Sequence, residues 1–357
     1  MPSAHSTSGW GSSLYDLTPS QLEAWVVQQG QSPYRAHQIL EALYQKDQGD
    51  PSSWTVIPKS LRDQLSREFP ESPFSLVQKQ ESSDGTAKWL WKLHDGQLLE
   101  TVLIPAAESR RTVCVSTQVG CAYRCAFCAS GMKGFLRDLT AGEIVQQVVQ
   151  VDRSLRPGRV GNIVFMGMGE PLSNYDNVIR AIRILNSPDG LKIGARKITI
   201  STVGLVPMME RLAKEGLQIE LAISLHAPND QVRGKLMPVN RRYPMVRLLA
   251  ACRAYVKATK RLITFEYILI DGVNDQPEHA EELAKRLKGL FCKVNLIPCH
   301  PIPGAPWGRP PQTRMLAFEK ILRLKGIACT LRTSRGLDIE GACGQLRLRH
   351  ETPTAVE

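Results

Sequence analysis

The chain has 357 residues, of which 43% are hydrophobic, and it carries a formal net charge of +11. This length allows one large α/β domain with a small appendage, and the positive charge favours a polyanionic partner such as a nucleic acid. No apolar run is long enough to span a membrane and residues 1–15 lack a secretion signal, so we expect a cytoplasmic protein with no membrane attachment.

The first part of the chain is predicted to be helical. Residues 1–13 are rich in Ser and Gly and are expected to be disordered, and residues 14–72 are expected to form a small helical domain. The first helix should begin after Thr18, because Thr18-Pro19-Ser20-Gln21 matches an N-cap, a first-turn proline and a capping glutamine. Gly30 should end it, and further helices are predicted at 32–46 and 58–69.

The pattern then changes from helical to extended. Strands are predicted at 74–80, 88–93 and 98–104, and an Asp-Gly pair lies in each of the two turns between them. We interpret residues 73–108 as a short β meander that links the helical domain to the rest of the chain.

Strands and helices alternate from residue 109 to residue 346. Six strands are predicted, at 112–116, 162–165, 197–201, 218–224, 264–270 and 293–297. Helical stretches separate them, the first opening with the capping box Thr140-Ala141-Gly142-Glu143, so the strands should be parallel. Six βα units are fewer than the eight of a closed barrel. We therefore predict a partial (β/α)6 barrel with ligands at the carboxyl ends of its strands, followed by a tail at 347–357.

Three of the nine cysteines lie close together after the first barrel strand. Cys121, Cys125 and Cys128 have the spacing C-x3-C-x2-C, which in a chain without a secretion signal indicates metal binding. Three thiolates on a four-iron cube leave one iron open to chelate S-adenosylmethionine (SAM). Together with the aromatic Phe127, the spacing matches the radical SAM pattern and predicts a [4Fe–4S] cluster. The alternative is a zinc loop with a distant fourth ligand.

A second motif, Gly167-Met168-Gly169-Glu170-Pro171, follows the second barrel strand. Glycines there permit close backbone approach to a ligand, and Glu170 can accept a hydrogen bond from the ammonium group of SAM. Its place directly after the strand that follows the cysteine loop favours a SAM site.

Through these motifs and several further segments, the chain resembles the RlmN/Cfr family of radical SAM enzymes over residues 14–346. The matching segments are LETVLIP at 99–105, VCVSTQVGC at 113–121, FMGMGEP at 165–171, IST at 200–202, SLH at 224–226 and DIEGACGQ at 338–345. The resemblance, which is greatest to the RlmN branch, implies a helical RNA-binding accessory domain before a radical SAM barrel. It also implies methylation of adenosine 2503 of 23S ribosomal RNA at C2, with C2 of adenosine 37 in some tRNAs as a further target.

The resemblance assigns roles to particular residues. Cys343 matches the cysteine that is methylated by one SAM, and a second SAM supplies the radical that activates this methyl group for attack on the RNA. Cys114 matches the partner that resolves the covalent protein–RNA link through a transient disulfide, and Glu100 matches the base that removes the ring proton. SAM contacts are implied at Gly169, Glu170, Ser201, Ser224, Leu225 and His226. His300 departs from the family, which usually carries a SAM-contacting Asn there, although a histidine can still donate a hydrogen bond.

Other cysteines and the basic residues have simpler interpretations. Cys252, Cys292, Cys299 and Cys329 are interpreted as structural, and Cys114 on its own would be a small buried side chain. Basic residues that could bind phosphates lie in one crossover (Arg233, Lys235, Arg241, Arg242, Arg247, Lys257, Lys260 and Arg261) and around Cys343 (Arg332, Arg335, Arg347 and Arg349). The expected partners are 23S rRNA, tRNA and an electron donor such as flavodoxin, and the expected state is a monomer.

Three other functions are compatible with the sequence. The nearest is methylation of the same adenosine at C8, a Cfr-like resistance activity. A radical SAM enzyme acting on a protein or small molecule is disfavoured by the pair Cys114 and Cys343 and by the basic charge. A non-catalytic RNA-binding protein with a structural metal predicts no cleavage of SAM.

Overall fold

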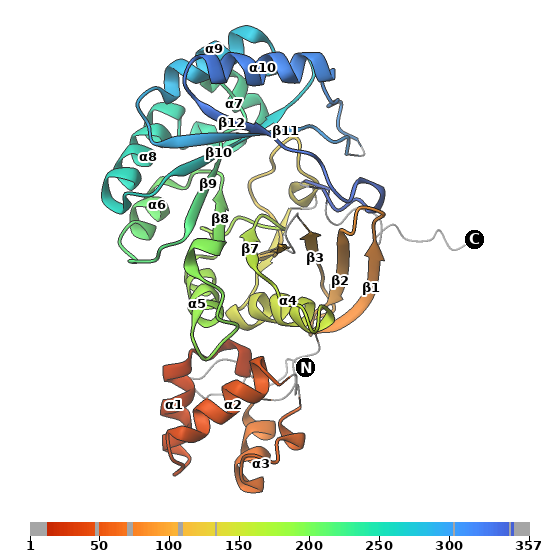
Figure 1. Ribbon diagram of the computed structural model, residues 1–357, viewed down its shortest axis with the longest axis vertical. Helices are drawn as coiled ribbons and strands as arrows, with labels where there is room; N and C mark the ends of the chain where they lie inside the picture. The colour runs from red at the N-terminus through yellow and green to blue at the C-terminus, as the bar shows by residue number, and fades with distance from the viewer. Residues whose placement is uncertain are drawn as a thin grey trace, which may run out of the picture.

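The computed structural model describes residues 13–46, 50–69, 74–105, 110–132, 134–302, 304–342 and 344–345. Its centre is a ten-stranded sheet with the strand order β1-β2-β3-β4-β7-β8-β9-β10-β11-β12 (Figure 1). The sheet curves, and most helices that connect its parallel strands lie on its outer side. A helical lobe lies at one end of the molecule.

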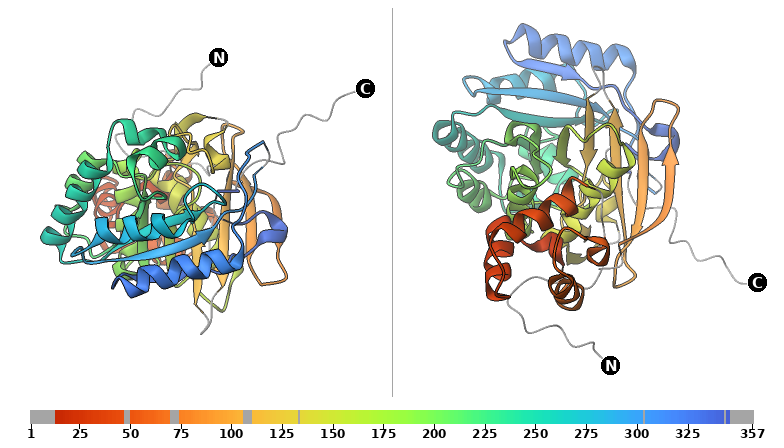
Figure 2. Two further views of the ribbon diagram at one scale, coloured as in Figure 1. Left: turned by 90° about the horizontal axis from the view of Figure 1, so that it is seen from above. Right: turned by 60° about the horizontal axis from the view of Figure 1, so that its bottom comes forward.

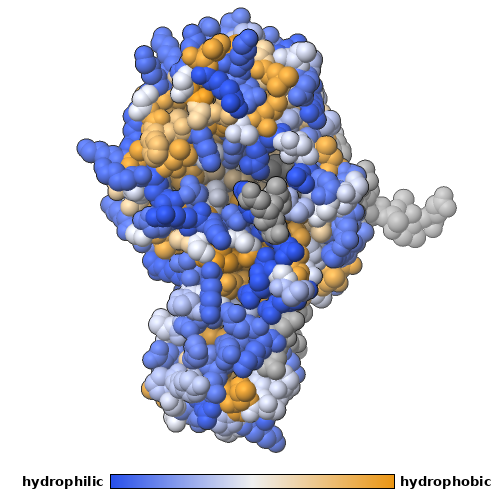
Figure 3. All heavy atoms as spheres, in the orientation of Figure 1, coloured by the Kyte–Doolittle hydropathy of each residue, from blue (hydrophilic) through white to orange (hydrophobic). Residues whose placement is uncertain are grey.

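The N-terminal lobe contains the helices α1 (Pro19–Gln28), α2 (Tyr34–Tyr44) and α3 (Lys59–Glu68). Thr18 caps α1 through the predicted capping box, because Gln21 N donates to Thr18 Oγ1 at 3.4 Å and Thr18 N donates to Gln21 Oε1 at 3.0 Å. Trp25 and Trp54 are fully buried and fill the centre of the lobe. The face of the lobe seen in Figure 3 is mainly hydrophilic.

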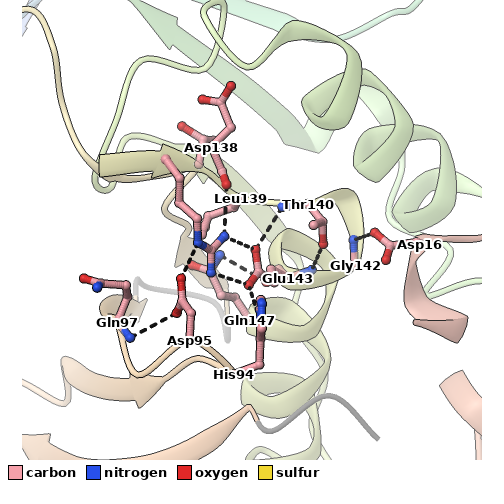
Figure 4. Close-up of polar contacts among 12 residues, drawn as sticks. Asp16, His94, Asp95, Gln97, Asp138, Leu139, Thr140, Gly142, Glu143 and Gln147 are labelled. Atoms are coloured by element: carbon pink, nitrogen blue, oxygen red, sulfur yellow. Dashed lines mark hydrogen bonds and ion pairs between the residues drawn. The ribbon is translucent and has the colours of Figure 1, made fainter. Parts of the chain in front are cut away.

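Polar contacts join this lobe to the barrel. Asp16 Oδ1 accepts a 2.6 Å hydrogen bond from Gly142 N in the first turn of α4 (Ala141–Ser154), and Gln45 Nε2 donates to Gly190 O at 2.5 Å. A Cβ atom at Gly142 would lie 2.9 Å from the Asp16 carboxyl group, so this close approach depends on glycine. Figure 4 shows Asp16 beside Gly142, and the right view of Figure 2 shows the lobe against this end of the barrel.

The predicted meander forms and continues the barrel sheet. Its strands β1 (Ser75–Glu81), β2 (Ala87–Lys92) and β3 (Leu98–Pro105) are antiparallel, and β3 pairs antiparallel with β4 (Arg111–Cys114). Every second side chain of β3 therefore lies on the same face of the sheet as the side chain of β4 with which it pairs.

In the described part of the chain, seven strands of the large sheet are parallel. These are β4, β7 (Asn162–Phe165), β8 (Ile198–Thr202), β9 (Glu220–Ser224), β10 (Ile263–Leu269), β11 (Cys292–Pro298) and β12 (Ala328–Leu331). All six predicted strands of the barrel form, and β12, which the sequence pattern did not indicate, adds a seventh. Besides α4, the helices are α5 (Tyr175–Asn186), α6 (Val206–Leu212), α7 (Asp230–Leu236), α8 (Met245–Thr259), α9 (Pro277–Leu287) and α10 (Gln312–Leu324).

The remaining elements are short. A two-stranded ribbon contains β5 (Gln118–Gly120) and β6 (Phe135–Asp138), and the 3₁₀ turns are η1 (Leu14–Asp16), η2 (Pro51–Ser53), η3 (Ala129–Gly131), η4 (Ala195–Lys197), η5 (Pro238–Arg241) and η6 (Leu337–Ile339). No helix in the described part of the chain combines the length and the apolar character that crossing a membrane requires.

An ion-pair network connects the ribbon, the meander and α4. The guanidinium of Arg137 on β6 binds both carboxylate oxygens of Glu143 at 2.8 Å and Asp95 Oδ2 at 2.6 Å. Glu143 also completes the predicted capping box of α4, accepting from Thr140 N at 2.9 Å (Figure 4). The start of the first crossover helix is therefore fixed relative to the turn between β2 and β3.

Candidate active site

A cavity lies at the carboxyl ends of the parallel strands. Its lining includes Val102 of β3, Cys114 of β4, Ser201 of β8, Ser224 at the end of β9 and Ile297 of β11. Ligands of barrels with this topology bind at this edge of the sheet, so the cavity lies where the sequence predicts the site.

The loop after β5 brings the three predicted cluster ligands into this cavity. Cys121, Cys125 and Cys128 all line it. Backbone contacts hold the loop, because Ala126 N donates to Leu236 O of α7 at 2.9 Å and Trp307 Nε1 donates to Ala126 O at 2.8 Å. The loop geometry is thus supported by elements that lie more than a hundred residues further along the chain.

The donor set of this loop suits an iron–sulfur cluster. Burial raises the pKa of Cys121 to about 12 and also raises the pKa of Cys125 and Cys128, so these thiols become thiolates only beside a compensating positive charge. Within the described residues no three His, Cys, Asp or Glu side chains are grouped closely enough to hold a single metal ion. A four-iron cube does not require this, because each thiolate binds a different iron atom.

The glycine-rich turn after β7 lies against the link between β4 and β5. A Cβ atom at Gly167 would lie 2.7 Å from the backbone of Val115, and one at Gly169, whose φ is +99°, would lie 2.5 Å from Gln118 Cβ. Only glycine permits this approach, which presents Gly169 and Glu170 to the cavity.

Glu170 ties this turn to the next strand. Its Oε1 accepts from Leu172 N at 3.0 Å, and its Oε2 accepts from Val203 N, just after β8, at 2.8 Å. Burial nevertheless raises the pKa of Glu170 to about 7. A positively charged ligand beside it, such as an ammonium group, would favour the ionised carboxylate.

The segment after β9 places one histidine in the cavity. Ser224 and His226 line the cavity, whereas Leu225 between them is fully buried and is not part of the lining that the structure describes. Leu225 N and His226 N both donate to Glu266 O of β10, at 3.1 and 3.2 Å. The ring of His226 meets Phe127 of the cysteine loop edge-on, with centroids 4.7 Å apart. The cysteine loop and the segment after β9 therefore support each other.

The interpretation of Arg233 as one of the basic residues available to phosphates is wrong. Its side chain is fully buried, and it donates to Val203 O at 2.8 Å, to Leu225 O at 3.2 Å and to Asn240 Oδ1 at 3.0 Å. The number of basic residues in this crossover does not show that Arg233 is buried, because the carbonyl groups to which it donates come from different loops. Arg233 joins the ends of β8 and β9 beneath the cavity.

His300 follows β11 and also lines the cavity. It is 8% exposed, and burial lowers its pKa, which favours the neutral ring. The structure therefore places His300 beside the other predicted SAM contacts, and its contact with SAM stays a prediction.

Cys114 and Glu100 lie on adjacent strands. Cys114 ends β4 and lines the cavity, while Glu100 of β3 is 2% exposed and is not among the described lining residues. Glu100 and Val102 are two residues apart, so their side chains lie on the same face of β3. Val102 pairs directly with Cys114. The predicted base is therefore the next side chain along this face from Val102, which lines the cavity. Its Oε1 lies 3.2 Å from Lys88 Nζ.

Cys343 lies outside the described residues. Ala342 and Gly344 on either side of it line the cavity. Gly344 O accepts a 2.7 Å hydrogen bond from Ala129 N, directly after the last cluster cysteine. A Cβ atom at Gly344, whose φ is +85°, would lie 3.0 Å from Phe127 O. The chain next to Cys343 is thus in contact with the cysteine loop.

Comparison with known proteins agrees with this geometry. Residues 115–287 match the radical SAM superfamily, and residues 12–69 match the ribosomal RNA large subunit methyltransferase N-terminal domain. The chain is 50% identical to the probable dual-specificity RNA methyltransferase RlmN of Geobacillus kaustophilus, over 94% of this chain and 93% of the relative. The chain belongs to the RlmN family. The corresponding protein of Bacillus cereus strain B4264 is 48% identical over the same shares of the two chains.

A solved structure that is similar to this chain in sequence has the same fold. The crystal structure of a radical SAM methyltransferase from Sphaerobacter thermophilus is 52% identical and superposes with a TM-score of 0.91, covering 94% of this chain and 99% of that chain. The predicted fold class is therefore confirmed, and membership of the radical SAM superfamily implies a [4Fe–4S] cluster and SAM as the cofactors.

Sequence reasoning missed two contributors to this RlmN-family site. Glu266 of β10 lines the cavity, is buried, and accepts from Asn295 Nδ2 at 2.9 Å. A carboxylate between Phe265 and Tyr267 in an apolar strand could have indicated it, since unpaired buried carboxylates are rare. Thr333 and Ser334 in the segment after β12 also line the cavity, although the sequence indicated only the basic residues beside them, Arg332 and Arg335.

Proposed function

We propose that this chain is a radical SAM RNA methyltransferase that adds a methyl group to C2 of adenosine 2503 in 23S rRNA and to C2 of adenosine 37 in some tRNAs. Half of its residues are identical to those of dual-specificity RlmN relatives over nearly its whole length. The observation that carries the proposal is a single cavity lined by Cys121, Cys125, Cys128, the Glu170 turn and Cys114.

The cluster and SAM are assigned to neighbouring parts of this cavity, because His226, a proposed SAM contact, packs against Phe127 of the cysteine loop. Cys121, Cys125 and Cys128 would hold the cluster, and the SAM contacts would be Gly169, Glu170, Ser201, Ser224, Leu225, His226 and His300. Leu225 would act through its backbone, because its side chain is buried away from the cavity. When bound, the cluster and SAM supply the one-electron chemistry that removes a hydrogen atom from a methyl group and an electron from the RNA adduct.

The protein side chains carry the methyl group and the proton. Two SAM molecules are used in each turnover, and one of them methylates Cys343 Sγ. After the activated carbon has bonded to the adenine ring, the Glu100 carboxylate accepts the C2 proton. The Cys114 thiolate then attacks Cys343 Sγ, forming a disulfide and breaking the S–C bond. The bonding electrons remain on the carbon, which takes up a proton and becomes the new methyl group.

RNA recognition is assigned to charged groups around the cavity mouth and to the N-terminal lobe. Arg332 and Arg335 are exposed residues that line the cavity, and Arg241 and Arg242 are exposed shortly after Met237, which also lines it. These cations suit phosphate contacts that position an RNA without reading its sequence. The adenine would have to leave its stack to enter the cavity. We further propose a cytoplasmic monomer that receives electrons from a donor such as flavodoxin.

The test is nucleoside analysis after expression in a bacterial host that lacks its own adenosine C2 methylation. Ribosomal RNA and tRNA are digested separately, and methyladenosines are identified by mass spectrometry. We expect 2-methyladenosine in both fractions from the wild-type protein. Cys125→Ser should abolish it, whereas Cys292→Ser, which changes a cysteine outside the described cavity lining, should retain it.

Other outcomes of this experiment have clear meanings. 8-Methyladenosine in ribosomal RNA would move the protein to the Cfr-like alternative with the same machinery. The absence of both 2-methyladenosine and 8-methyladenosine from the two fractions would contradict the proposed substrate. 2-Methyladenosine in ribosomal RNA alone would remove tRNA from the proposal.

A further inference from the structure

A buried lysine lies beside the proposed base. Lys88 of β2 is 7% exposed and Glu100 is 2% exposed, and Lys88 Nζ lies 3.2 Å from Glu100 Oε1. Lysine is among the residues least often buried, because removing its ammonium group from water is costly unless an opposite charge is close. A lysine at this depth therefore needs a partner, and Glu100 is the carboxylate that contacts it.

The strand register directs both charges to the same face of the sheet. Lys88 pairs with Val102, and Leu90 pairs with Glu100, so Lys88 is the diagonal neighbour of Glu100. Val102 in turn pairs with Cys114 across the next strand. Lys88, Val102 and Cys114 thus form a row across three strands that leads from the lysine to the cavity wall.

Lys88 also contacts the segment that leads to Cys343. Its Nζ donates to Glu340 O at 3.5 Å, three residues before Cys343. The turn between β1 and β2 fixes the start of that segment, because Asp84 Oδ2 accepts from Gly336 N at 3.0 Å and Ser83 N donates to Asp338 Oδ2 at 3.4 Å. Figure 1 shows the chain after β12 passing beside the ends of β1 and β2. One ammonium group therefore contacts both the proposed base and the approach to the proposed methyl carrier.

We infer that Lys88 is a positioning residue for the methyl transfer, which sets the Glu100 carboxylate relative to the segment carrying Cys343. The inference rests on the proposed function. A proton acceptor contributes only when its oxygen lies within hydrogen-bond reach of the proton, and small displacements reduce the rate steeply. An ammonium group that binds both the carboxylate and the Glu340 carbonyl restricts their relative position.

This role predicts a selective defect. Without Lys88 the methylation of Cys343 and the cleavage of SAM should continue, because neither step uses Glu100. Loss of the ring proton should become slow, so that SAM is consumed with little product. A merely structural role would instead lower all of these activities together.

The experiment compares purified, cluster-loaded wild type with Lys88→Met, Lys88→Arg and Lys92→Met, using target RNA with hydrogen or deuterium at adenine C2. Lys92 is the matched control, because it is an exposed lysine on the same strand. The measurements are iron content, S-methylcysteine, 5′-deoxyadenosine and 2-methyladenosine. For Lys88→Met we expect normal iron and methylation of Cys343, and a ratio of 2-methyladenosine to 5′-deoxyadenosine lowered by about 10-fold to 100-fold. The C2 deuterium isotope effect should increase, and Lys88→Arg should restore part of the ratio.

An unchanged ratio and isotope effect in Lys88→Met would overturn the inference. If Lys88→Met loads neither iron nor methyl group, Lys88→Gln, which keeps a hydrogen-bond donor without the charge, is judged by the same ratio. Wild-type protein that forms 5′-deoxyadenosine but no 2-methyladenosine would refute the proposed function itself. The two failures are therefore distinguishable.

Discussion

The ring of His226 accepts a 2.9 Å hydrogen bond at Nδ1 from the backbone N–H of Ile268. Because the backbone N–H is the donor, Nδ1 carries a lone pair and the neutral ring holds its proton on Nε2. His226 follows β9 and Ile268 belongs to β10, so the contact also joins the ends of neighbouring strands at the cavity. The ring is therefore fixed as a neutral hydrogen-bond donor.

The burial of His226 should make the protein less stable in acid. Burial lowers its pKa from 6.5 to about 3, so its stabilising contribution is complete above pH 6.5 and is lost as the pH falls towards 3. His226→Asn should flatten the pH dependence of the free energy of unfolding in this range, by at most about 1.4 kcal/mol per pH unit. Urea titrations of cluster-free protein at several pH values would measure this. His37→Asn, at a histidine with 59% side-chain exposure, is the control, and equal slopes for His226→Asn and wild type would contradict the prediction.

Arg233→Met should destabilise the barrel strongly. The substitution removes the donor from the buried carbonyl group of Leu225 and from the part-buried carbonyl group of Val203, at a cost of about 3–5 kcal/mol in total. The urea midpoint should fall while the dependence of the unfolding free energy on urea stays the same. Arg242→Met, at an exposed position of the same crossover, should change stability by less than about 0.5 kcal/mol. A loss below about 1 kcal/mol for Arg233→Met would show that water replaces these contacts.

Variants of the two cysteines that we propose to react should fail at different stages of the reaction. Cys343→Ala should abolish methylation of the protein and of RNA while leaving the iron content unchanged, because Cys343 is the proposed carrier. Cys114→Ala should permit methylation of Cys343 but prevent resolution of the adduct. Denaturing gels with labelled RNA should then show a protein–RNA band for Cys114→Ala and none for Cys343→Ala. Continued turnover by Cys114→Ala without this band would remove its resolving role.

Arg332 should contribute to RNA affinity without contributing to sequence preference. Arg332→Gln removes an exposed cation at the cavity, so binding of target and non-target RNA should weaken by similar factors. The slope of log affinity against log salt should become shallower by about 1. Filter binding over a salt series would measure both quantities. Arg323→Gln on α10, outside the described cavity lining, is the control, and equal slopes for the two variants would argue against a phosphate contact by Arg332.

The parts of the fold that were predictable from sequence depend on local signals. The capping boxes at Thr18 and Thr140 involve residues only three positions apart, and both form as predicted. β12 escaped prediction because it is a strand of only four residues, with two of them exposed, so it lacks a clear apolar pattern.

The candidate site was predictable where residues form a motif and less so where they meet only in three dimensions. The cysteine triad and the Glu170 turn are contiguous in sequence, and both line the cavity. Arg233 looked like a surface cation because its partners, such as Val203 and Tyr243, come from separate loops. The contact between Lys88 and Glu340 joins residues 252 positions apart, and no sequence pattern reports it.

The most direct test of the central claim is the fate of a deuterated methyl group. SAM with three deuterium atoms on its methyl carbon is supplied to the cluster-loaded enzyme and target RNA, and products formed after the first turnover are analysed by mass spectrometry. Transfer through Cys343 requires one deuterium to move to 5′-deoxyadenosine and one solvent proton to enter the new methyl group. The account therefore predicts 2-methyladenosine with two deuterium atoms, whereas a product that retains all three would show direct methyl transfer and contradict it.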